Sequence, residues 1–525
     1  MKSIRKMMAL VLAMVMVLAM GVTAFAAPGD QLSSPETTIE ATNLTAGDSV
    51  VYFQLVEWST SVRDWVLTET GESCGVSLAD LKDGISAEEA ATIASRVSGE
   101  GSPMTVSGTT ATATVDAGLY YLLATPADTN KDTVYNPAFV SADYKEGGNT
   151  VDFSTTYSES AVLKKSDNTF DKSVNDTDQT KYNDVKPGDV IPYKITTKIP
   201  SYSGAFTNPK FEITDDLSAG LTLYGDITVK YGNETTTATN GDVTITPDTA
   251  DGGGFVIKFS DDYLLSDRGL VDVEITYSAQ VTTNAPKSVN AMDNTATLEF
   301  SNKPGETETK EDITRHYTFS IDGGLLGGGD EVTKELIKTG TDANGDPITE
   351  TTEYYNSKEA APLTGATFTL TPVAPTTGEA KTTQSLADGR INFSGLDAGT
   401  YTLVETAAPA GFIKDSREFT VTITPTYDTD TPDLLLSYEI TITSPQAGDT
   451  PAYSGGATFT MTNEGETIVK TTASGEGTDT SFINNTQGSE LPSTGGIGTT
   501  IFYIIGAILV LGGGVLLVSR RRMNA

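Results

Sequence analysis

Alternating apolar and polar positions dominate the middle of the chain and predict β-strands. The alternation has a period of two residues, and clusters of Gly, Asn, Asp and Pro separate the alternating segments. The clearest segments are residues 190–197, 221–230, 255–259, 271–277 and 401–405. Many short strands between regular turn signals are typical of antiparallel β-sandwiches. The chain is therefore predicted to be all-β.

One segment in the first third of the chain departs from this pattern and predicts a helix. Residues 87–97 follow Ser86, and Glu89 stands three positions after that serine. This is the spacing of a capping box, in which the two side chains satisfy backbone donors at the start of a helix.

Two apolar runs at the ends of the chain are too long for strands. Residues 7–21 follow a short basic stretch and precede Ala24-Phe25-Ala26, which is the order of a secretory signal peptide over residues 1–26. Residues 497–518 are uncharged and long enough to cross a hydrocarbon core of about 30 Å. We expect the three arginines at 520–522 to stay on the cytoplasmic side of this transmembrane helix.

Composition divides the rest of the chain into three domains. The charged segment 164–168 and the polar segment 304–312 have the composition of junctions, and we expect the second to be a linker. The predicted units are a signal peptide at 1–26, domains at 27–165, 166–313 and 314–488, and a C-terminal segment at 489–525. Each domain is long enough to bury its own core.

The charge of the chain limits its partners and its chemistry. Asp and Glu total 70 against 34 Lys and Arg, a formal net charge of −36. Nucleic acid is excluded as a partner because phosphate binding needs a basic patch. Cys74 is the only cysteine, so no intramolecular disulfide can form. The single histidine, His316, rules out a histidine-based metal site or catalytic triad, and we expect neither a metal nor a cofactor.

A pentapeptide stands directly ahead of the C-terminal apolar run. Its residues are Leu491, Pro492, Ser493, Thr494 and Gly495. Proline favours extended geometry before it, and glycine gives a flexible chain after it, so the site suits the groove of a peptidase. Pentapeptide, apolar span and basic tail together resemble the LPxTG cell-wall sorting signal of Gram-positive surface proteins. The resemblance implies that a sortase cleaves between Thr494 and Gly495 and transfers the threonine acyl group to an amine.

The second domain resembles the isopeptide-forming fimbrial domain of Gram-positive pilins, a collagen-adhesin A-type sandwich. Three segments carry the resemblance, namely Phe170–Val174, Phe211–Leu221 and Asn294–Phe300. It implies an amide bond between Lys172 in a first strand and Asn294 in a last strand, with Asp215 relaying protons.

Burial explains why such a bond needs these residue types. An amine attacks only when it is neutral, and an apolar core lowers the pKa of a lysine while it raises that of a carboxylic acid. A protonated carboxyl can then polarise the amide carbonyl and pass a proton to departing ammonia. By residue type alone, Lys, Asp and Asn would more often be surface or turn residues.

The third domain resembles the collagen-adhesin B-type, or SpaA-like, repeat of the same surface proteins. The matching segments are Leu363–Leu370 and Phe393–Phe412. Glu405 occupies the glutamate motif of that family, which implies the proton-relay role. The corresponding lysine is predicted as Lys338, with Lys334 as alternative, and the corresponding asparagine as Asn485, with Asn484 as alternative.

A polymerising pilin also needs a lysine that accepts the acyl group. In the family this lysine lies at the end of the first domain, where Lys164 and Lys165 stand in a motif that matches only in part. We predict Lys165 as the acceptor and keep Lys164 as the alternative.

These observations lead to one hypothesis and two rivals. We predict a secreted, wall-anchored structural pilin, the shaft subunit of a pilus, without enzymatic activity towards other molecules. Its expected partners are sortase, neighbouring pilin subunits and peptidoglycan, while minor pilins and host surface ligands stay open. The rivals are a monomeric wall-anchored adhesin, which would need no acceptor lysine, and a wall-anchored hydrolase with a pair of carboxylates.

Overall fold

The computed structural model describes most of the chain between the two terminal segments. The described residues are 36–146, 149–175, 180–266, 268–286, 291–321, 337–344, 363–387, 389, 391–431, 433–443, 457–462, 468–471, 482–488 and 497–523. The predicted signal peptide and the sorting pentapeptide lie outside these residues.

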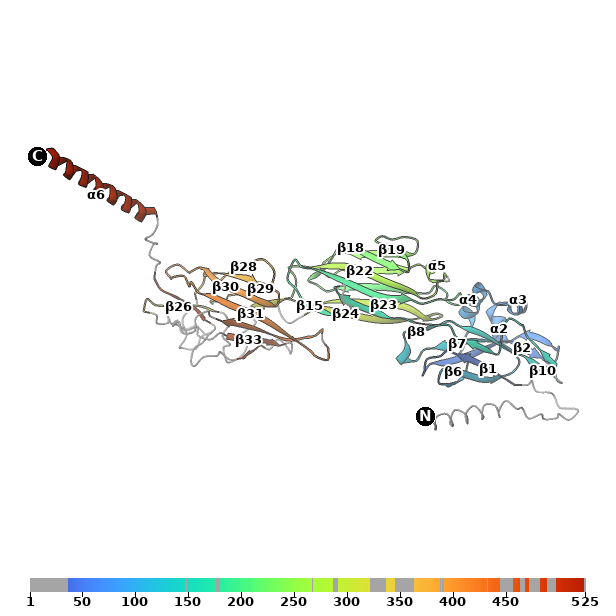
Figure 1. Ribbon diagram of the computed structural model, residues 1–525. Helices are drawn as coiled ribbons and strands as arrows, with labels where there is room; N and C mark the ends of the chain where they lie inside the picture. Colours follow the sequence, from blue (N-terminus) through green and yellow to red (C-terminus); the bar gives the residue numbers. More distant parts are fainter. Residues whose placement is uncertain are drawn as a thin grey trace, which may run out of the picture.

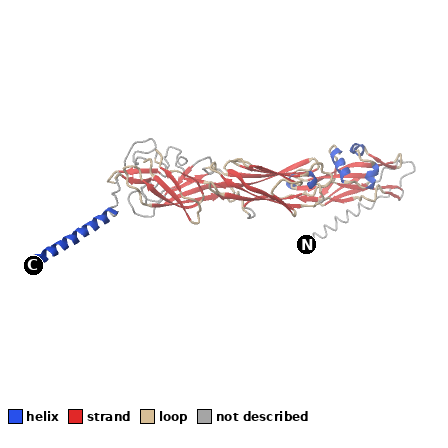
Figure 2. Cartoon of the chain, turned by 90° about the horizontal axis from the view of Figure 1, so that it is seen from above, coloured by secondary structure: helices blue, strands red, loops and turns tan. Residues whose placement is uncertain are grey.

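Three β-modules follow one another along an elongated molecule, and the C-terminal helix stands away from them (Figures 1 and 2). Strands β1 to β13 form the first module, β14 to β24 the second and β25 to β35 the third. This architecture confirms the predicted all-β fold. The clear alternating segments all lie in strands, because alternation gives each strand one face for the core and one for solvent.

The first module has two four-stranded sheet paths, β12-β1-β6-β5 and β3-β2-β7-β9, and β4 pairs with β2 beside the second path. Two further strand pairs are β10-β11 and β8-β13. The strands are β1 (Thr37–Thr42), β2 (Ser49–Ser59), β3 (Asp64–Leu67), β4 (Ser102–Pro103), β5 (Thr105–Ser107), β6 (Thr110–Val115), β7 (Gly118–Thr125), β8 (Thr133–Tyr135), β9 (Ala138–Ala142), β10 (Tyr144–Glu146), β11 (Asn149–Val151), β12 (Ser160–Val162) and β13 (Lys165–Asp167). The boundary expected after residue 165 falls within β13.

The first module also contains short helices. The predicted helix is confirmed as α4 (Ala87–Arg96), and both hydrogen bonds of its capping box are present, from Glu89 N–H to Ser86 and from Ser86 N–H to Glu89. The sequence pattern does not predict α2 (Glu69–Cys74), α3 (Leu78–Asp83) or the 3-10 turn η1 (Asp128–Asn130). These elements are too short for a helical period to be recognised.

The second module is a sandwich of a five-stranded sheet, β14-β16-β22-β18-β19, and a six-stranded sheet, β15-β24-β23-β17-β21-β20. Its elements are β14 (Phe170–Val174), β15 (Tyr182–Asp184), β16 (Val190–Ile199), β17 (Phe211–Leu217), β18 (Leu221–Tyr231), β19 (Glu234–Thr236), β20 (Val243–Asp248), β21 (Gly254–Phe259), the helix α5 (Asp261–Leu264), β22 (Val271–Val281), β23 (Met292–Lys303) and β24 (Glu306–Tyr317). A continuous apolar core fills the space between the two sheets.

The expectation of a linker at residues 304–312 is wrong. This segment belongs to a hairpin, in which β24 pairs with β23 from Glu306 to His316. β24 exposes polar side chains over its first half, and that polarity resembles a linker in the sequence. Consequently β23, which carries Asn294, is not the last strand of its module, and the boundary expected after residue 313 falls within β24.

The third module contains a seven-stranded sheet, β28-β27-β30-β31-β32-β33-β34, and two strand pairs, β25-β29 and β26-β35. Its strands are β25 (Phe319–Ile321), β26 (Ile337–Thr341), β27 (Thr367–Val373), β28 (Lys381–Gln384), β29 (Phe393–Leu396), β30 (Gly399–Ala407), β31 (Glu418–Tyr427), β32 (Leu435–Thr443), β33 (Ala457–Thr462), β34 (Ile468–Thr471) and β35 (Phe482–Thr486). The C-terminal helix α6 (Ile497–Met523) contains an apolar span from Ile504 to Arg522 that is long enough to cross a membrane.

The second and third modules meet at a polar joint. The ring of Tyr182 packs on that of Tyr427 with centroids 4.2 Å apart, and the hydroxyl of Tyr317 donates to the carbonyl of Asp433 at 2.8 Å. Lys186 forms an ion pair of 2.6 Å with Asp397. These contacts connect the two modules through side chains as well as through the chain itself.

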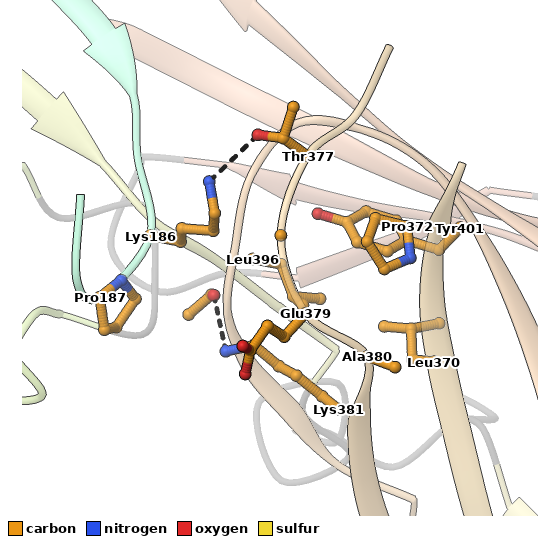
Figure 3. Close-up of a pocket in the computed structure, with 12 residues that line it drawn as sticks. Lys186, Pro187, Leu370, Pro372, Thr377, Glu379, Ala380, Lys381, Leu396 and Tyr401 are labelled. Atoms are coloured by element: carbon orange, nitrogen blue, oxygen red, sulfur yellow. Dashed lines mark hydrogen bonds between the residues drawn. The ribbon is translucent and has the colours of Figure 1, made fainter. Parts of the chain in front are cut away.

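A cavity of about 350 Å³ lies at this joint. Lys186 and Pro187 of the second module face the turn that joins β27 to β28 (Figure 3). Lys381 donates to the carbonyls of Ser394 and Gly395 at 2.7 and 2.8 Å. Both lysines in the cavity wall are therefore engaged in structural contacts.

Candidate functional site

The second module brings Lys172, Asp215 and Asn294 together in its core. All three side chains are fully buried. Lys172 lies on β14, the edge strand of the five-stranded sheet, whereas Asp215 on β17 and Asn294 on β23 belong to the six-stranded sheet. Asp215 pairs with Ala296, two residues from Asn294, so both side chains point to the same face. A bond from Lys172 to Asn294 would join the two sheets.

Short hydrogen bonds connect these side chains. The Lys172 amine donates to the Asp215 carboxyl and, at 2.5 Å, to Oδ1 of Asn294. The hydroxyl of Tyr277 on β22 donates to Oδ2 of Asp215 at 2.6 Å, and Nδ2 of Asn294 donates to that hydroxyl at 3.0 Å. No motif points to Tyr277, because tyrosine is an ordinary residue for the buried face of a strand.

Burial favours the neutral forms of both reacting groups, the Lys172 amine and the Asp215 carboxyl. Desolvation lowers the pKa of Lys172, although Asp215 opposes this effect, and desolvation raises the pKa of Asp215, although Lys172 opposes it. The rings of Tyr193 and Tyr277 lie 5.5 and 5.7 Å from the amine. A neutral amine beside a protonated carboxyl is the pair that amide formation requires.

The side chain of His316 is buried next to this cluster. Its Nε2 is 2.7 Å from the hydroxyl of Tyr193, and its Nδ1 is 2.5 Å from Oδ1 of Asn183. Burial is the main cause that lowers the pKa of His316 to about 3, and a protonated Lys172 would act in the same direction. The imidazole is therefore neutral at physiological pH. Its hydrogen bonds position Tyr193 and Asn183 next to the cluster.

The third module assembles a second cluster from Lys338, Glu405 and Asn485. Lys338 and Glu405 are fully buried, and Asn485 is 1% exposed. β26 and β35 run parallel, and Lys338 pairs with Ile483, two residues before Asn485. Glu405 comes from β30 of the seven-stranded sheet. Lys334 and the side chain of Asn484 lie outside the described residues.

Hydrogen bonds fix the carboxyl of Glu405 next to the amide. Nδ2 of Asn485 donates to Oε2 of Glu405 at 2.8 Å and to the carbonyl of Ile413 at 2.6 Å. The backbone N–H of Asp415 donates to the same Oε2 at 2.5 Å. The Lys338 amine is 3.8 Å from Oε1 of Glu405. Within the described residues, that Oε1 and Oδ1 of Asn485 have no hydrogen-bond partner.

The electrostatics of this cluster parallel those of the second module. Desolvation lowers the pKa of Lys338 to about 8, and Glu405 opposes the shift. Desolvation raises the pKa of Glu405. Lys172 and Lys338 are the buried lysines among the residues that the structure describes.

The ion pair at the joint between the modules shows the opposite behaviour. Burial lowers the pKa of Lys186, but the carboxylates of Asp397 and Asp189 outweigh burial and raise it overall. A protonated amine has no lone pair for attack on a carbonyl. A lysine close to a carboxylate is therefore not sufficient for amide formation.

The two acceptor candidates differ in exposure. Lys164 is exposed, whereas Lys165 is half-buried and its amine donates to the hydroxyl of Thr45 at 2.8 Å. Lys165 lies on β13, at the passage from the first module to the second. The acyl-donor residues 491–495 are outside the described part of the chain.

Comparisons with known proteins agree with this architecture. Residues 351–433 match a family model described as the SpaA prealbumin-like fold domain, and residues 483–524 match the LPXTG cell wall anchor motif. The trypsin-resistant surface T6 protein of Streptococcus pyogenes serotype M6 is 26% identical over 573 residues, covering 97% of this chain and 99% of the relative.

One solved structure superposes well on this chain. The T6 backbone pilin of serotype M6 Streptococcus pyogenes, a modular three-domain structure, superposes with a TM-score of 0.57 at 19% identity, covering 87% of this chain and 100% of that one. This chain has the fold of a backbone pilin. The full-length major pilin SpaD from Corynebacterium diphtheriae gives a TM-score of 0.44 at 17% identity, and the alignment covers 73% of this chain and 90% of SpaD. The anchor motif identifies the pilin-like chain as a wall-anchored surface protein, and implies sortase as its partner.

Proposed function

We propose that this protein is the structural shaft subunit of a covalently polymerised pilus, stabilised by two internal Lys–Asn isopeptide bonds. The observation that carries the proposal is the pair of buried clusters, each with a lysine, a carboxylic acid and an asparagine in a wall-anchored chain with a pilin fold. Such buried ionisable groups are costly to a fold unless they are paired or used.

The proposed bond in the second module forms by amide exchange. The neutral Lys172 amine attacks Cγ of Asn294, while Asp215 supplies a proton to the amide and receives one from the attacking nitrogen. The Cγ–Nδ2 bond then breaks, and ammonia leaves with the protons that it needs. The product ties positions 122 residues apart, and loop closure of that length suggests about 4 to 5 kcal/mol of stabilisation.

The same exchange is proposed for the third module. Lys338 attacks the Asn485 amide, and Glu405, already in contact with Nδ2, serves as the proton relay. The bond would connect β26 to β35, the strand that precedes the anchor. Both modules would then resist extension when load passes from the anchor along the shaft.

Polymerisation is proposed to join Thr494 of one subunit to Lys165 of the next, through sortase. Donor and acceptor are different segments far apart in the sequence, so we expect a heterologous contact that extends as an open fibre. The Lys165 amine would have to leave Thr45 to enter the enzyme, while Lys164 is already exposed. Terminal subunits would be attached to peptidoglycan by the same chemistry.

Mass spectrometry of the digested chain tests the internal bonds. We expect two branched peptides, Lys172 on Asn294 and Lys338 on Asn485, each lighter by one ammonia, ~17 Da, than the sum of its parts. Linear peptides alone at these four positions would refute the isopeptide proposal. Each proposed bond gives its own branched peptide, so the two bonds are tested independently.

Immunoblotting of wall extracts tests polymerisation. We expect a ladder that survives boiling in detergent, lost in Lys165→Ala and kept in Lys164→Ala. A branched peptide carrying Thr494 on Lys164 would overturn the choice of acceptor. A single band in the unaltered protein would instead support a monomeric wall-anchored adhesin.

A further inference from the structure

The hydroxyl of Tyr277 stands between the acid and the amide of the second cluster. It donates to Oδ2 of Asp215 at 2.6 Å and accepts from Nδ2 of Asn294 at 3.0 Å. This nitrogen is the atom that must depart as ammonia in the proposed exchange. A single phenol oxygen thus touches both the proton source and the leaving group.

Among the described residues of the third module, no hydroxyl bridges the acid and the amide of the cluster in this way. Oε2 of Glu405 receives a hydrogen bond directly from Nδ2 of Asn485 at 2.8 Å. Glutamate is one methylene longer than aspartate, so its carboxyl reaches further from the strand. In the second cluster the structure places a hydroxyl between the shorter acid and the nitrogen.

We propose that Tyr277 is a catalytic residue of the second module, which relays a proton from Asp215 to the departing nitrogen of Asn294. The inference rests on the proposed isopeptide function and extends it to a residue outside the lysine, acid and asparagine set. It assigns Tyr277 to a step that Glu405 performs alone in the third module.

The step balances without any added reactant. After the Lys172 amine attacks, Nδ2 loses its amide conjugation and gains a lone pair, so it can accept a hydrogen bond. Tyr277 gives its hydroxyl proton to Nδ2 and takes a proton from the Asp215 carboxyl. The Cγ–Nδ2 bond breaks, ammonia leaves, and the attacking nitrogen returns its proton to Asp215. Tyr277 ends with the proton count with which it began.

The environment of the ring suits this role. Tyr277 pairs with Tyr193 across β22 and β16, and their rings stack with centroids 5.0 Å apart. Phe255 packs edge-on against Tyr277 at 4.8 Å. Burial raises the pKa of Tyr277 well above its ordinary value, so the phenol keeps its proton until a base develops beside it. A fixed, neutral hydroxyl can both donate and accept.

The test follows the two crosslinks in the same full-length chain. After pulse labelling, the branched Lys172–Asn294 and Lys338–Asn485 peptides are quantified over time by mass spectrometry. We expect Tyr277→Phe to slow the first by about 10²-fold, the usual scale of general acid–base assistance, and to leave the second unchanged. Tyr202→Phe, which removes another buried hydroxyl from the same core, should change neither rate.

A rescue experiment separates proton relay from packing. In the double variant Asp215→Glu with Tyr277→Phe, the longer acid reaches the amide as in the third module, and most of the lost rate should return. Tyr277→Phe that crosslinks at the original rate would overturn the relay, and so would a double variant as slow as Tyr277→Phe alone. If the unaltered chain formed no Lys172–Asn294 peptide, the proposed function itself would fail in this module.

Discussion

The second and third modules hold the same three chemical groups in different frameworks. In the second, Lys172 faces an acid and an amide on the opposite sheet of a sandwich. In the third, Lys338 and Asn485 lie on adjacent parallel strands, and Glu405 reaches them from the large sheet. The strand arrangement differs, whereas the burial of a lysine, a carboxylic acid and an asparagine recurs.

The comparison of the two clusters indicates which features the proposed chemistry needs. Both clusters shift the lysine pKa down and the carboxyl pKa up, and desolvation is the main cause in each. The length of the acid varies, and the contacts to the amide nitrogen vary with it. In the second module Tyr277 contacts that nitrogen, and in the third Glu405 and the Ile413 carbonyl do.

Removal of either carboxyl should give the largest effect. Asp215→Asn should slow only the Lys172–Asn294 crosslink, and Glu405→Gln only the Lys338–Asn485 crosslink, each by about 10²- to 10⁴-fold, because the proton relay is lost. Quantification of the branched peptides checks this. Two exposed acids of the same sheets provide controls, since Asp216→Asn on β17 and Glu439→Gln on β32 should leave both crosslinks intact. Simultaneous loss of both crosslinks in one variant would contradict two independent sites.

A side chain at Gly340 should disturb only the third module. Gly340 pairs with Asn485 across the two parallel strands, and an added Cβ would come within 2.7 Å of the Phe412 ring and 3.0 Å of Leu363. Gly340→Ala should therefore lower the unfolding free energy of this module by about 1 to 3 kcal/mol, as overpacking does. Urea unfolding followed by module-specific proteolysis measures the loss. Gly241→Ala, which meets open space, should be close to neutral.

Mild acid should weaken the second module more than the third. The pKa of His316 is about 3 in the folded chain against an ordinary value of 6.5, so the unfolded state binds more protons between these values. Stability is then lost as the pH falls below 6.5, by up to about 1.4 kcal/mol per pH unit. Hydrogen exchange of each module at pH 6.5 and pH 5 tests this. His316→Gln should remove the difference, and an equal acid sensitivity in that variant would assign it to other groups.

The third module should show a pH dependence of the same sign, but in the alkaline range, when it cannot crosslink. In Asn485→Ala, Lys338 keeps its amine, and its folded pKa of about 8 lies below the ordinary 10.5. The unfolded state binds the extra proton between these values, so stability should rise as the pH increases from 8, by about 1 kcal/mol per pH unit. Urea unfolding at pH 8 and pH 9 measures it. The rise should vanish when Lys338→Met is added.

Local pattern accounts for much of what could be predicted. The period-two alternation identified the strands of the second module because each of them has one buried and one solvent face. The same pattern failed at β24, whose first half is polar, and at the short helices of the first module. In those places the neighbouring strands and loops decide the structure, and a single segment does not reveal its neighbours.

The amino-acid sequence was enough to predict the strand-rich character, the C-terminal span and a candidate lysine, acid and asparagine for each cluster. Motifs could single out Lys172, Asp215 and Asn294 because their local sequences are distinctive. What surrounds these residues could not be predicted without the folded chain, because burial and pKa depend on groups far apart in the sequence. Asn294 and Tyr277 lie on different sheets, and Tyr277 has no local motif, so the fold alone brings its hydroxyl between the acid and the amide.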